Sequence, residues 1–515
     1  MDYQLANSSD IFDTIITRRC ISPNYIFLLM EQKLGIPGFC RLRVSASRRA
    51  AQRHSQNHTL SDIYDELAII LRLDLERIRS IMNLELSLER ENVIPIKENI
   101  DILEVDTILI SDMYLGEAEI KNLLRIAGVV NHYPLIITSS GKTTGRVWRE
   151  LRRKDFVVNH FGDSQHSDVH MAQKSGMTTE LTQISKPTFF ERELLVHGLH
   201  SFAFALREAR LRTSRCAGKK HSNNASHKPT ERQCFLAKMQ AEINLPLLAK
   251  MAFYIIDNMH LSPRSHVLLF SSRGSYLLYR LCKSMISRMG IKNIICHYWL
   301  SSRDARLTSS KDYIEYCLSI AGDITYFIDL TGSLVSFQKL ESELRLCTNA
   351  SDFKFLLGVY YDSKNSAYRK QTLERTGVDV SNMSIDHMHC FEMSQLSDCM
   401  ILPEFLNFSP EAKVIDVLKI YDSYIPIREE YEFSDDAACM VHYSSKYCTD
   451  LLENFVDCIS KNMLNISTES KTESFDAILK KTIARNYQQL AELFNTYFLE
   501  GHMASERLHL NRKFV

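Results

Sequence analysis

Short apolar runs alternate with helix-like segments over much of the first part of the chain. The runs TILIS (107–111), LIITSS (135–140) and FVVNHFGD (156–163) each end in small or acidic residues. Each is followed by a segment with apolar residues at helical spacing, as in IKNLLRIAG, GRVWRELRR and DVHMAQKSG. Strands that alternate with helices are typical of a parallel sheet, so the pattern predicts an α/β fold with a Rossmann-like parallel sheet.

The pattern changes to helices alone between residues 18 and 105. Apolar residues recur there at three- and four-residue spacing, as in LSDIYDELAIILR and LERIRSIMNLELSLEREN. We interpret this block as a helical cap inserted over the ligand-binding edge of the sheet. Glu85 and Glu89 lie four residues apart on one helical face, which predicts a solvated face. The alternative is a cap residue that reaches into the site.

A polar stretch, SRCAGKKHSNNASHKPTER (214–232), separates this part from a second set of strand-like runs. Four further apolar runs are each followed by a polar loop: HVLLFSSRGS, IICHYWLSSRD, ITYFIDLTGS and FKFLLGVYY. A helical pattern dominates after them. The sequence therefore predicts four parts. They are a first α/β domain (1–195), a helix with a polar linker (196–235), a second Rossmann-like α/β domain (236–408) and a mainly helical C-terminal region (409–515).

The composition of the chain indicates which partners and which cellular compartment to expect. The 515 residues include 62 basic and 62 acidic side chains, which gives no net charge and no indication of a nucleic-acid or membrane partner. Thirteen cysteines occur without a C-x-x-C pair, which favours free thiols in a reducing compartment. The N-terminus has no signal-peptide pattern, and the apolar run LPLLAKMAFYII contains a lysine. We expect a soluble, cytoplasmic protein.

Polar residues follow the ends of four successive predicted strands. They are Asp10 after the first strand, Ser111 after the helical block, Lys142 after LIITSS, and Asp163 with Asp168 in FGDSQHSD. Carboxylates are ligands that Mg²⁺ prefers, while a lysine and a hydroxyl can hold phosphate oxygens. A carboxylate can also attack phosphorus and form an aspartyl-phosphate. Helix capping explains each residue singly, but it explains the set poorly.

In this order, the segments resemble the motifs of the haloacid-dehalogenase-like (HAD) hydrolase superfamily. DIFDT is similar to the first motif, ILISD to the second, GKTTG to the third and GDSQHSD to the fourth. The resemblance covers roughly the first 190 residues and includes a helical cap, which this superfamily often carries. It implies Asp10 as the catalytic nucleophile, Thr14 as its trailing threonine, Ser111 and Lys142 as catalytic and substrate-binding groups, and Asp10, Phe12, Asp163 and Asp168 as the Mg²⁺ site.

One position departs from the superfamily pattern. Its phosphatases usually carry a second aspartate two residues after the nucleophile, where this chain has Phe12. Phenylalanine cannot transfer a proton, although its backbone carbonyl can still bind a metal. Asp13 lies one residue further, and in a strand its side chain would face the other way. The variant DIFDT followed by IITR also resembles a bacterial group whose genes accompany surface-polysaccharide synthesis.

The second half carries a looser resemblance. LLFSSRGSYLLYRL and YFIDLTGSL resemble the phosphate loops of type I phosphoribosyltransferases, which implies substrate binding by Thr331, Gly332 and Ser333. Only Asp329 precedes this loop, whereas that family usually has two adjacent acids. An ordinary tight turn between a strand and a helix is the alternative. We interpret Arg303 with Asp304 as an exposed ion pair, and the alternative is that they line the same cleft.

Two hypotheses of function follow. The first is a magnesium-dependent HAD-type hydrolase or phosphotransferase that acts on a small phosphorylated metabolite, a sugar phosphate or a nucleotide, through an aspartyl-phosphate. The second is a catalytically weak or inactive HAD scaffold that binds a phosphorylated ligand or a partner protein through its second half. Phe12 favours the scaffold, and retention of the other motif residues favours the enzyme.

Overall fold

The computed structural model describes most of the chain. The described residues are 4–54, 58–216, 229–332, 335–348, 352–360, 387–392, 406–407, 411–429, 435–460 and 462–497. They form two compact units, of which the first comprises Met1–Thr188 with Phe204–His227 and the second Phe189–Ala203 with Lys228–Val515. The division falls within helix α10 (His200–Arg212), which follows α9 (Phe189–Val196). The domain bounds expected from the sequence stay a prediction, and residues 217–228 of the polar stretch lie outside the described residues.

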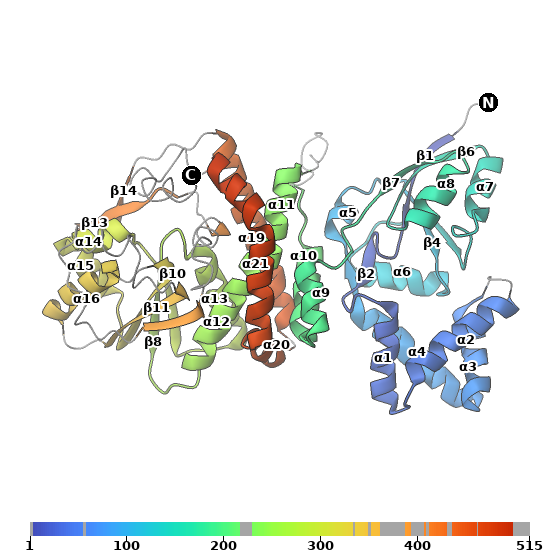
Figure 1. Ribbon diagram of the computed structural model, residues 1–515, viewed down its shortest axis with the longest axis horizontal. Coiled ribbons are helices and arrows are strands. Elements are labelled where there is room, and N and C mark those ends of the chain that lie inside the picture. Colours follow the sequence, from blue (N-terminus) through green and yellow to red (C-terminus); the bar gives the residue numbers. More distant parts are fainter. Residues whose placement is uncertain are drawn as a thin grey trace. The chain divides into compact units, whose positions relative to one another are not determined.

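The first unit is built on a five-stranded parallel sheet (Figure 1). Its strands are β1 (Gln4–Asp10), β4 (Ile108–Asp112), β5 (Leu135–Thr138), β6 (Phe156–Gly162) and β7 (Thr178–Leu181). The spatial order β5-β4-β1-β6-β7 places the first strand in the centre. Successive strands therefore run first to one side of β1 and then to the other, as in doubly wound sheets.

Helices cover both faces of this sheet. On one face, Leu109 packs in a core with α6 (Glu117–Ile126) and the helical block. On the other, Ile110 packs with Val147 and Trp148 of α7 (Arg146–Arg153). This alternation of successive residues is what a strand buried on both sides requires. A π-helical turn η1 (Gln165–His170) and the short helix α8 (Met171–Gln173) follow β6.

The helical block leaves the sheet through a short antiparallel pair of strands, β2 (Ile16–Arg18) and β3 (Val93–Pro95). Between them lie α1 (Pro23–Leu34), α2 (Phe39–Arg53), α3 (Leu60–Leu71) and α4 (Leu75–Asn92), and α5 (Lys97–Asp101) follows. Ser22, Thr59 and Asp74 cap α1, α3 and α4 by accepting backbone N–H bonds at their first turns. The described helices agree with the helical block expected between the first and second long strands.

The second unit contains another parallel sheet of five strands. They are β8 (His266–Ser271), β9 (Ile294–Trp299), β10 (Ile324–Gly332), β11 (Asp352–Tyr360) and β12 (His387–Glu392). The order β12-β11-β10-β8-β9 again has strands added on both sides of the first. The two sheets thus differ in strand order, but both are parallel and doubly wound. The α/β class expected from the sequence is confirmed.

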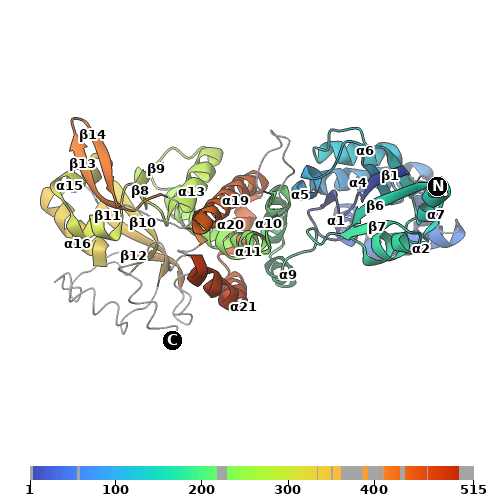
Figure 2. The ribbon, with the colours of Figure 1, turned by 90° about the horizontal axis from the view of Figure 1, so that it is seen from above.

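Helices and a hairpin surround the second sheet. One face packs on α14 (Arg303–Thr308), α15 (Lys311–Ser319) and α16 (Val335–Cys347). The other elements are α11 (Glu231–Met239), η2 (Gln240–Asn244), α12 (Leu245–Met259), α13 (Tyr276–Met289), α19 (Asp435–Ile459), α20 (Met463–Ser470) and α21 (Glu473–Tyr497). Figure 2 shows α11, α19, α20 and α21 gathered on one side of this unit's sheet. Within the described residues, no helix is both long and apolar enough to cross a lipid bilayer.

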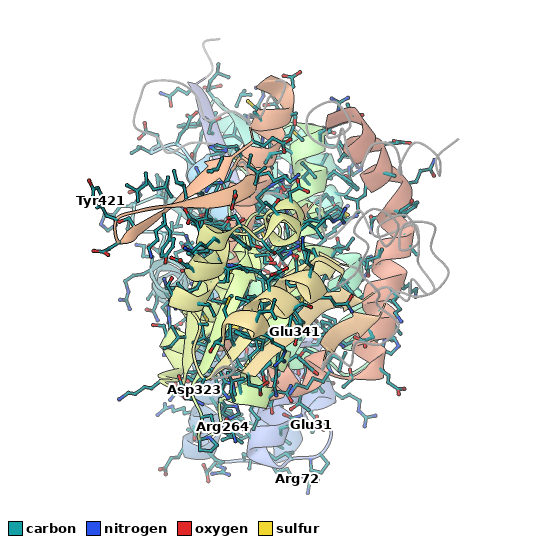
Figure 3. All side chains as sticks on the ribbon, turned by 90° about the vertical axis from the view of Figure 1, so that its left-hand side faces the viewer. Glu31, Arg72, Arg264, Asp323, Glu341 and Tyr421 are labelled. Carbon is teal, nitrogen blue, oxygen red and sulfur yellow. The ribbon has the colours of Figure 1, made fainter. Side chains whose placement is uncertain are left out.

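The region expected to be mainly helical begins with a strand hairpin that the sequence did not predict. It consists of β13 (Val414–Ile420) and β14 (Ser423–Arg428), with Tyr421 at its tip in a left-handed conformation. Figure 3 shows Tyr421 pointing away from the ribbon, and its side chain is exposed. Alternation in VIDVLKI and SYIPIR is the pattern of a half-exposed ribbon. Within this C-terminal region, the described residues that follow the hairpin are mainly helical.

Candidate metal centre

The central strand of the first sheet delivers Asp10 to its carboxyl edge. Asp10 is the last residue of β1 and lies opposite Ile110 of β4 in the register. The next strand of this sheet after β1 is β4, on one side of β1. The next strand after β6 is β7, which lies further out on the other side. Ligands of open α/β sheets bind at such a switch point, outside the carboxyl ends of the strands. Only 5% of the Asp10 surface is exposed, so its carboxyl group is nearly removed from solvent.

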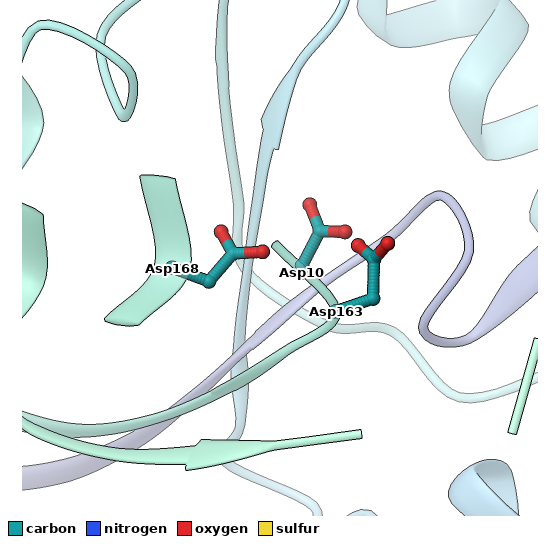
Figure 4. A group of neighbouring side chains, drawn as sticks. All are labelled: Asp10, Asp163 and Asp168. Atoms are coloured by element: carbon teal, nitrogen blue, oxygen red, sulfur yellow. The ribbon is translucent and has the colours of Figure 1, made fainter. Parts of the chain in front are cut away.

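Asp163 and Asp168 reach the same place from the end of β6. Asp163 follows the last residue of that strand, and Asp168 lies in the π-helical turn η1. Figure 4 shows the three carboxyl groups close together, with Asp10 between the other two. One oxygen of each lies within 4.8 Å of the others. Gly162 makes this approach possible, because a Cβ there would come within 2.5 Å of the Asp168 carboxyl carbon.

Lys142 links two of these carboxylates. Its Nζ binds Asp10 Oδ1 and lies 2.7 Å from Asp168 Oδ1, and only 3% of the residue is exposed. The loop that carries it is held by Asp112, which accepts the backbone N–H of Lys142 at 2.9 Å and that of Thr143 at 2.9 Å. Asp112 therefore positions the lysine from the end of β4, one residue after Ser111.

A buried chain of hydrogen bonds fixes Asp168. His160 Nε2 lies 3.3 Å from Asp168 Oδ1, and His160 Nδ1 lies 2.8 Å from Ser8 Oγ. The backbone N–H of Ser164 donates to the other carboxylate oxygen at 3.0 Å. The imidazole is fully buried and packs edge-on against Trp148. Burial lowers the pKa of His160, so the ring is neutral at pH 7.

Charge is unbalanced in this cluster. Burial raises the pKa of Asp10 to about 7 despite the nearby ammonium of Lys142, and Asp168 and Asp163 add to the rise. Burial, with Asp13 and Asp168, likewise raises the pKa of Asp163 to about 6. For Asp168, burial is outweighed by the His160 hydrogen bond and the Lys142 charge, and its pKa is lowered. One ammonium thus faces three carboxyl groups that cannot all ionise easily.

These donors fit a divalent cation. Ionised Asp10, Asp163 and Asp168 with protonated Lys142 carry two net negative charges, which a divalent ion balances. Carboxylate oxygens from separate elements are suitable ligands for a hard cation such as Mg²⁺ or Ca²⁺. The carboxyl cluster can therefore bind a metal ion.

The remaining residues expected at the site lie around this cluster. Ser111 is buried in β4, one position beyond the partner of Asp10. Thr14 Oγ1 donates to Asp10 Oδ2 at 3.2 Å. The Phe12 ring lies under the guanidinium of Arg18, 5.0 Å from ring centroid to Cζ. Asp13 adopts a left-handed φ of 59° and accepts a hydrogen bond from the Thr17 hydroxyl.

The cap does not present the solvated acidic face expected from the sequence. Glu85 is fully buried and forms two hydrogen bonds of 2.7 Å with Arg43, and Glu89 is buried against Arg18. The Tyr64 hydroxyl also donates to Glu85. Spacing along one helix cannot show a charged partner on another, so the solvated-face expectation was wrong. Since Arg18 also covers Phe12, its ion pair with Glu89 connects the cap helix α4 to the edge of the site.

The polar residues of the second sheet form a different cluster. Asp329 lies 3.3 Å from Arg306 Nη2, and Arg306 also donates to Ser271, Ser301 and Ser336. Thr331 and Gly332 belong to β10, whereas Ser333 lies outside the described residues. The structure therefore describes no complete loop of Thr331, Gly332 and Ser333, and their substrate-binding role stays a prediction. The pairing expected for Asp304 with Arg303 is instead an ion pair with Lys413.

Sequence reasoning missed His160, Asp112 and Arg306. Asp112 follows Ser111 at a strand end, and the rule that selected Ser111 also applies to it. His160 lies in the run FVVNHFGD, two residues before Gly162, at a buried position of β6. Nothing in its local pattern distinguishes it from a packed aromatic residue. His166 and His170 are exposed on η1.

Comparison with known proteins adds no assignment. No protein-family model matches the chain, and no curated protein sequence matches it either. The resemblance to HAD hydrolases therefore depends on the motif residues of the sequence alone.

Proposed function

We propose that the protein is a magnesium-dependent HAD-type hydrolase or phosphotransferase acting on a small phosphorylated metabolite. The observation that carries the proposal is the convergence of Asp10, Asp163 and Asp168 with Lys142 at the carboxyl edge of the first sheet. The central position of β1, the strand order and the helical block after the first strand also support a HAD-type architecture. The proposed substrate is a sugar phosphate or a nucleotide.

In this proposal, Asp10 is the nucleophile. A bound Mg²⁺ would neutralise the carboxylates and withdraw charge from the transferring phosphoryl group. Metal binding also favours the ionised form of Asp10, whose pKa is about 7 without it. The ionised carboxylate attacks phosphorus, the bond to the leaving oxygen breaks, and an aspartyl-phosphate forms. Lys142 and Ser111 hold phosphoryl oxygens during this transfer.

The second step returns the enzyme to its starting state. A water molecule, or an acceptor hydroxyl in a phosphotransferase, attacks the aspartyl-phosphate and releases Asp10. This attack and the departure of the first leaving group both need a proton-transfer group. Phe12 occupies the position where related phosphatases have an aspartate, and its ring lies against Arg18. We therefore expect slow turnover, a preference for activated leaving groups and an accumulating intermediate.

The environment of Phe12 also favours the second candidate function, a catalytically weak or inactive scaffold. The ring contact with Arg18 stabilises the turn after β1 but provides no acid or base. In this alternative the protein binds a phosphorylated ligand or a partner protein through its second half, without turnover. The two candidates differ in whether phosphate is released.

A substrate screen tests the enzyme proposal. Phosphate release from sugar phosphates, nucleotides and nitrophenyl phosphate should require Mg²⁺ and stop when EDTA is added. Asp10→Asn should abolish it, whereas Asp65→Asn, a matched change at an exposed cap position, should not. Metal-dependent phosphate release that survives Asp10→Asn would exclude the aspartyl-phosphate mechanism. Ligand binding without release would favour the scaffold.

A further inference from the structure

A surface pocket of the first unit is lined mainly by cations. It lies between α7 and the segment after η1, has a volume of about 320 Å³, and is lined by Arg149, Arg152, Arg153, Met171, Lys174 and Ser175. Among the described residues, none that lines it is acidic. Its volume falls at the lower end of the range for small-molecule sites. Arg149, Arg153 and Lys174 are exposed, so a ligand could reach the pocket from solvent.

The pocket brings like charges close together. Residues three and four positions apart share a helical face, which places Arg152 and Arg153 beside Arg149 on α7. Like charges at this spacing destabilise a helix. The acid of α7, Glu150, pairs instead with Lys154. Across the described part of the chain, no carboxylate forms an ion pair with Arg149, Arg153 or Lys174.

Helix stabilisation explains only part of this cluster. Arg152 and Arg153 lie in the last turn of α7, where cations interact favourably with the helix dipole. Arg149 lies in the first half of the same helix, and Lys174 comes from a different segment. The dipole therefore gives no reason for bringing all four cations around one pocket.

A glycine of the Lys142 loop lies against the wall of the pocket. Gly145 has a left-handed φ of 74°, and a Cβ at this position would lie 2.8 Å from Met171 Cε and 3.0 Å from Arg149 Nη1. Both of these residues line the pocket. The ends of the Arg149 and Met171 side chains therefore both lie close to Gly145. The backbone N–H of Gly145 also donates to the carbonyl of Lys142 at 2.9 Å.

We propose that this pocket binds the diphosphate group of a small molecule, separately from the carboxyl cluster. Arg149, Arg153 and Lys174 supply three positive charges, which complement an anion with roughly three negative charges, and a diphosphate carries this charge whereas a single phosphate does not. Arginine forks bind two oxygens of one phosphate group, so α7 can bind adjacent groups. Free pyrophosphate and a nucleoside diphosphate share this chemistry. The proposal does not depend on the hydrolase activity.

Calorimetry on the full chain in EDTA tests the site independently of the metal centre. Without metal, Asp10, Asp163 and Asp168 repel anions, so anion binding reports the basic pocket. The probes are inorganic pyrophosphate, ADP and sulfate at constant ionic strength. We expect pyrophosphate to bind at least about tenfold more tightly than sulfate, and tighter binding of ADP would indicate that a nucleoside is also recognised.

The double variant Arg149→Gln with Arg153→Gln should weaken pyrophosphate binding by about 30-fold. Arg79→Gln, at an exposed position of α4, should leave it unchanged. Because the substituted side chains are exposed, all variants should keep the parental circular dichroism spectrum and melting temperature. No binding of pyrophosphate or ADP at about 1 mM, or equal affinity in the double variant, would overturn the proposal. Binding of heparin or duplex DNA alone would also overturn it.

Discussion

The two parallel sheets carry polar clusters at their carboxyl edges, but carboxylates outnumber cations in only one of them. In the second sheet, the Arg306 guanidinium pairs with Asp329, Arg303 acts on both, and Arg306 also donates to three serine hydroxyls. In the first sheet, Lys142 faces three carboxyl groups, and the pKa of Asp10 rises to about 7. Similar strand-end patterns in the sequence thus produce a core cluster whose one carboxylate lies beside arginines, and a carboxylate-rich cluster that can bind a cation.

The difference determines what each cluster should do when one member is removed. In a neutralised pair, loss of one partner leaves a buried charge, and the folded state is destabilised. In the carboxyl cluster, loss of one carboxylate lowers repulsion in the metal-free protein and removes a ligand of the metal-bound protein. Substituting a charged member of the second-sheet cluster should therefore lower the stability of the fold. Substituting a carboxylate of the first-sheet cluster should instead lower metal binding and activity.

The largest effect is expected at Asp10. Asp10→Asn keeps the shape of the side chain but removes the nucleophile, so turnover of a verified substrate should fall by about 10³-fold or more. The burst of product and the trapped covalent intermediate should disappear together. Rapid-quench measurements with nitrophenyl phosphate would show both. A burst of parental size in Asp10→Asn would assign the nucleophile to another residue.

The next effect concerns the stability of the second unit. Arg306→Met leaves Asp329 buried without its cation and should lower the free energy of unfolding by about 3 kcal/mol. The double variant Arg306→Met with Asp329→Asn should recover much of this loss, because the buried charge is gone. Urea denaturation measures both values. Equal destabilisation in the single and double variants would show that packing of the guanidinium against Phe337, 4.2 Å away, matters more than charge.

A pH dependence should distinguish the first cluster. The folded pKa values of Asp10 and Asp163, about 7 and about 6, lie above their unfolded values near 3.8. The metal-free fold therefore binds protons more tightly than the unfolded chain and loses stability as pH rises from about 4 to about 7. Metal must displace these protons, so Mg²⁺ should raise the melting temperature more at pH 8 than at pH 5.5. A shift that is independent of pH would contradict the raised pKa values.

The smallest effect is expected at Asp13. This residue lies near enough to raise the pKa of Asp163, but its own carboxylate accepts the Thr17 hydroxyl. Asp13→Asn should therefore reduce turnover by less than about tenfold, since Asn also tolerates the left-handed φ and can accept the same bond. Steady-state kinetics beside Asp10→Asn measure the contrast. A loss as large as that of Asp10→Asn would make Asp13 the missing acid.

The sequence predicted the parts of the fold that local patterns encode. The runs before Asp10, Ser111 and Asp163 are strands of one parallel sheet, and the helical block lies where the spacing indicated. The edge strand β7 has little apolar character and was missed, because only one neighbouring strand, β6, pairs with it. The hairpin of β13 and β14 was missed because its alternation is short and lies in a region otherwise dominated by helical patterns.

The sequence predicted those site residues that follow strands. It did not predict the interactions of residues whose partners lie far away in the chain. Strand ends placed Asp10, Lys142 and Asp163 near one edge. The burial of Glu85 depends on Arg43, which lies on another helix, and the pairing of Asp329 depends on Arg306 on a different element. No local spacing specifies such partners. The pairing of each carboxylate with a cation is therefore visible only in the folded chain.

The central claim, that the first sheet holds a divalent cation between its carboxylates, is tested most directly by calorimetric titration with Mg²⁺. The parent should bind one ion per chain, and Asp163→Asn should bind it at least about tenfold more weakly with the fold intact. Asp65→Asn, at an exposed position of α3, should match the parent. Equal Mg²⁺ affinity in the parent and in Asp163→Asn would contradict the account.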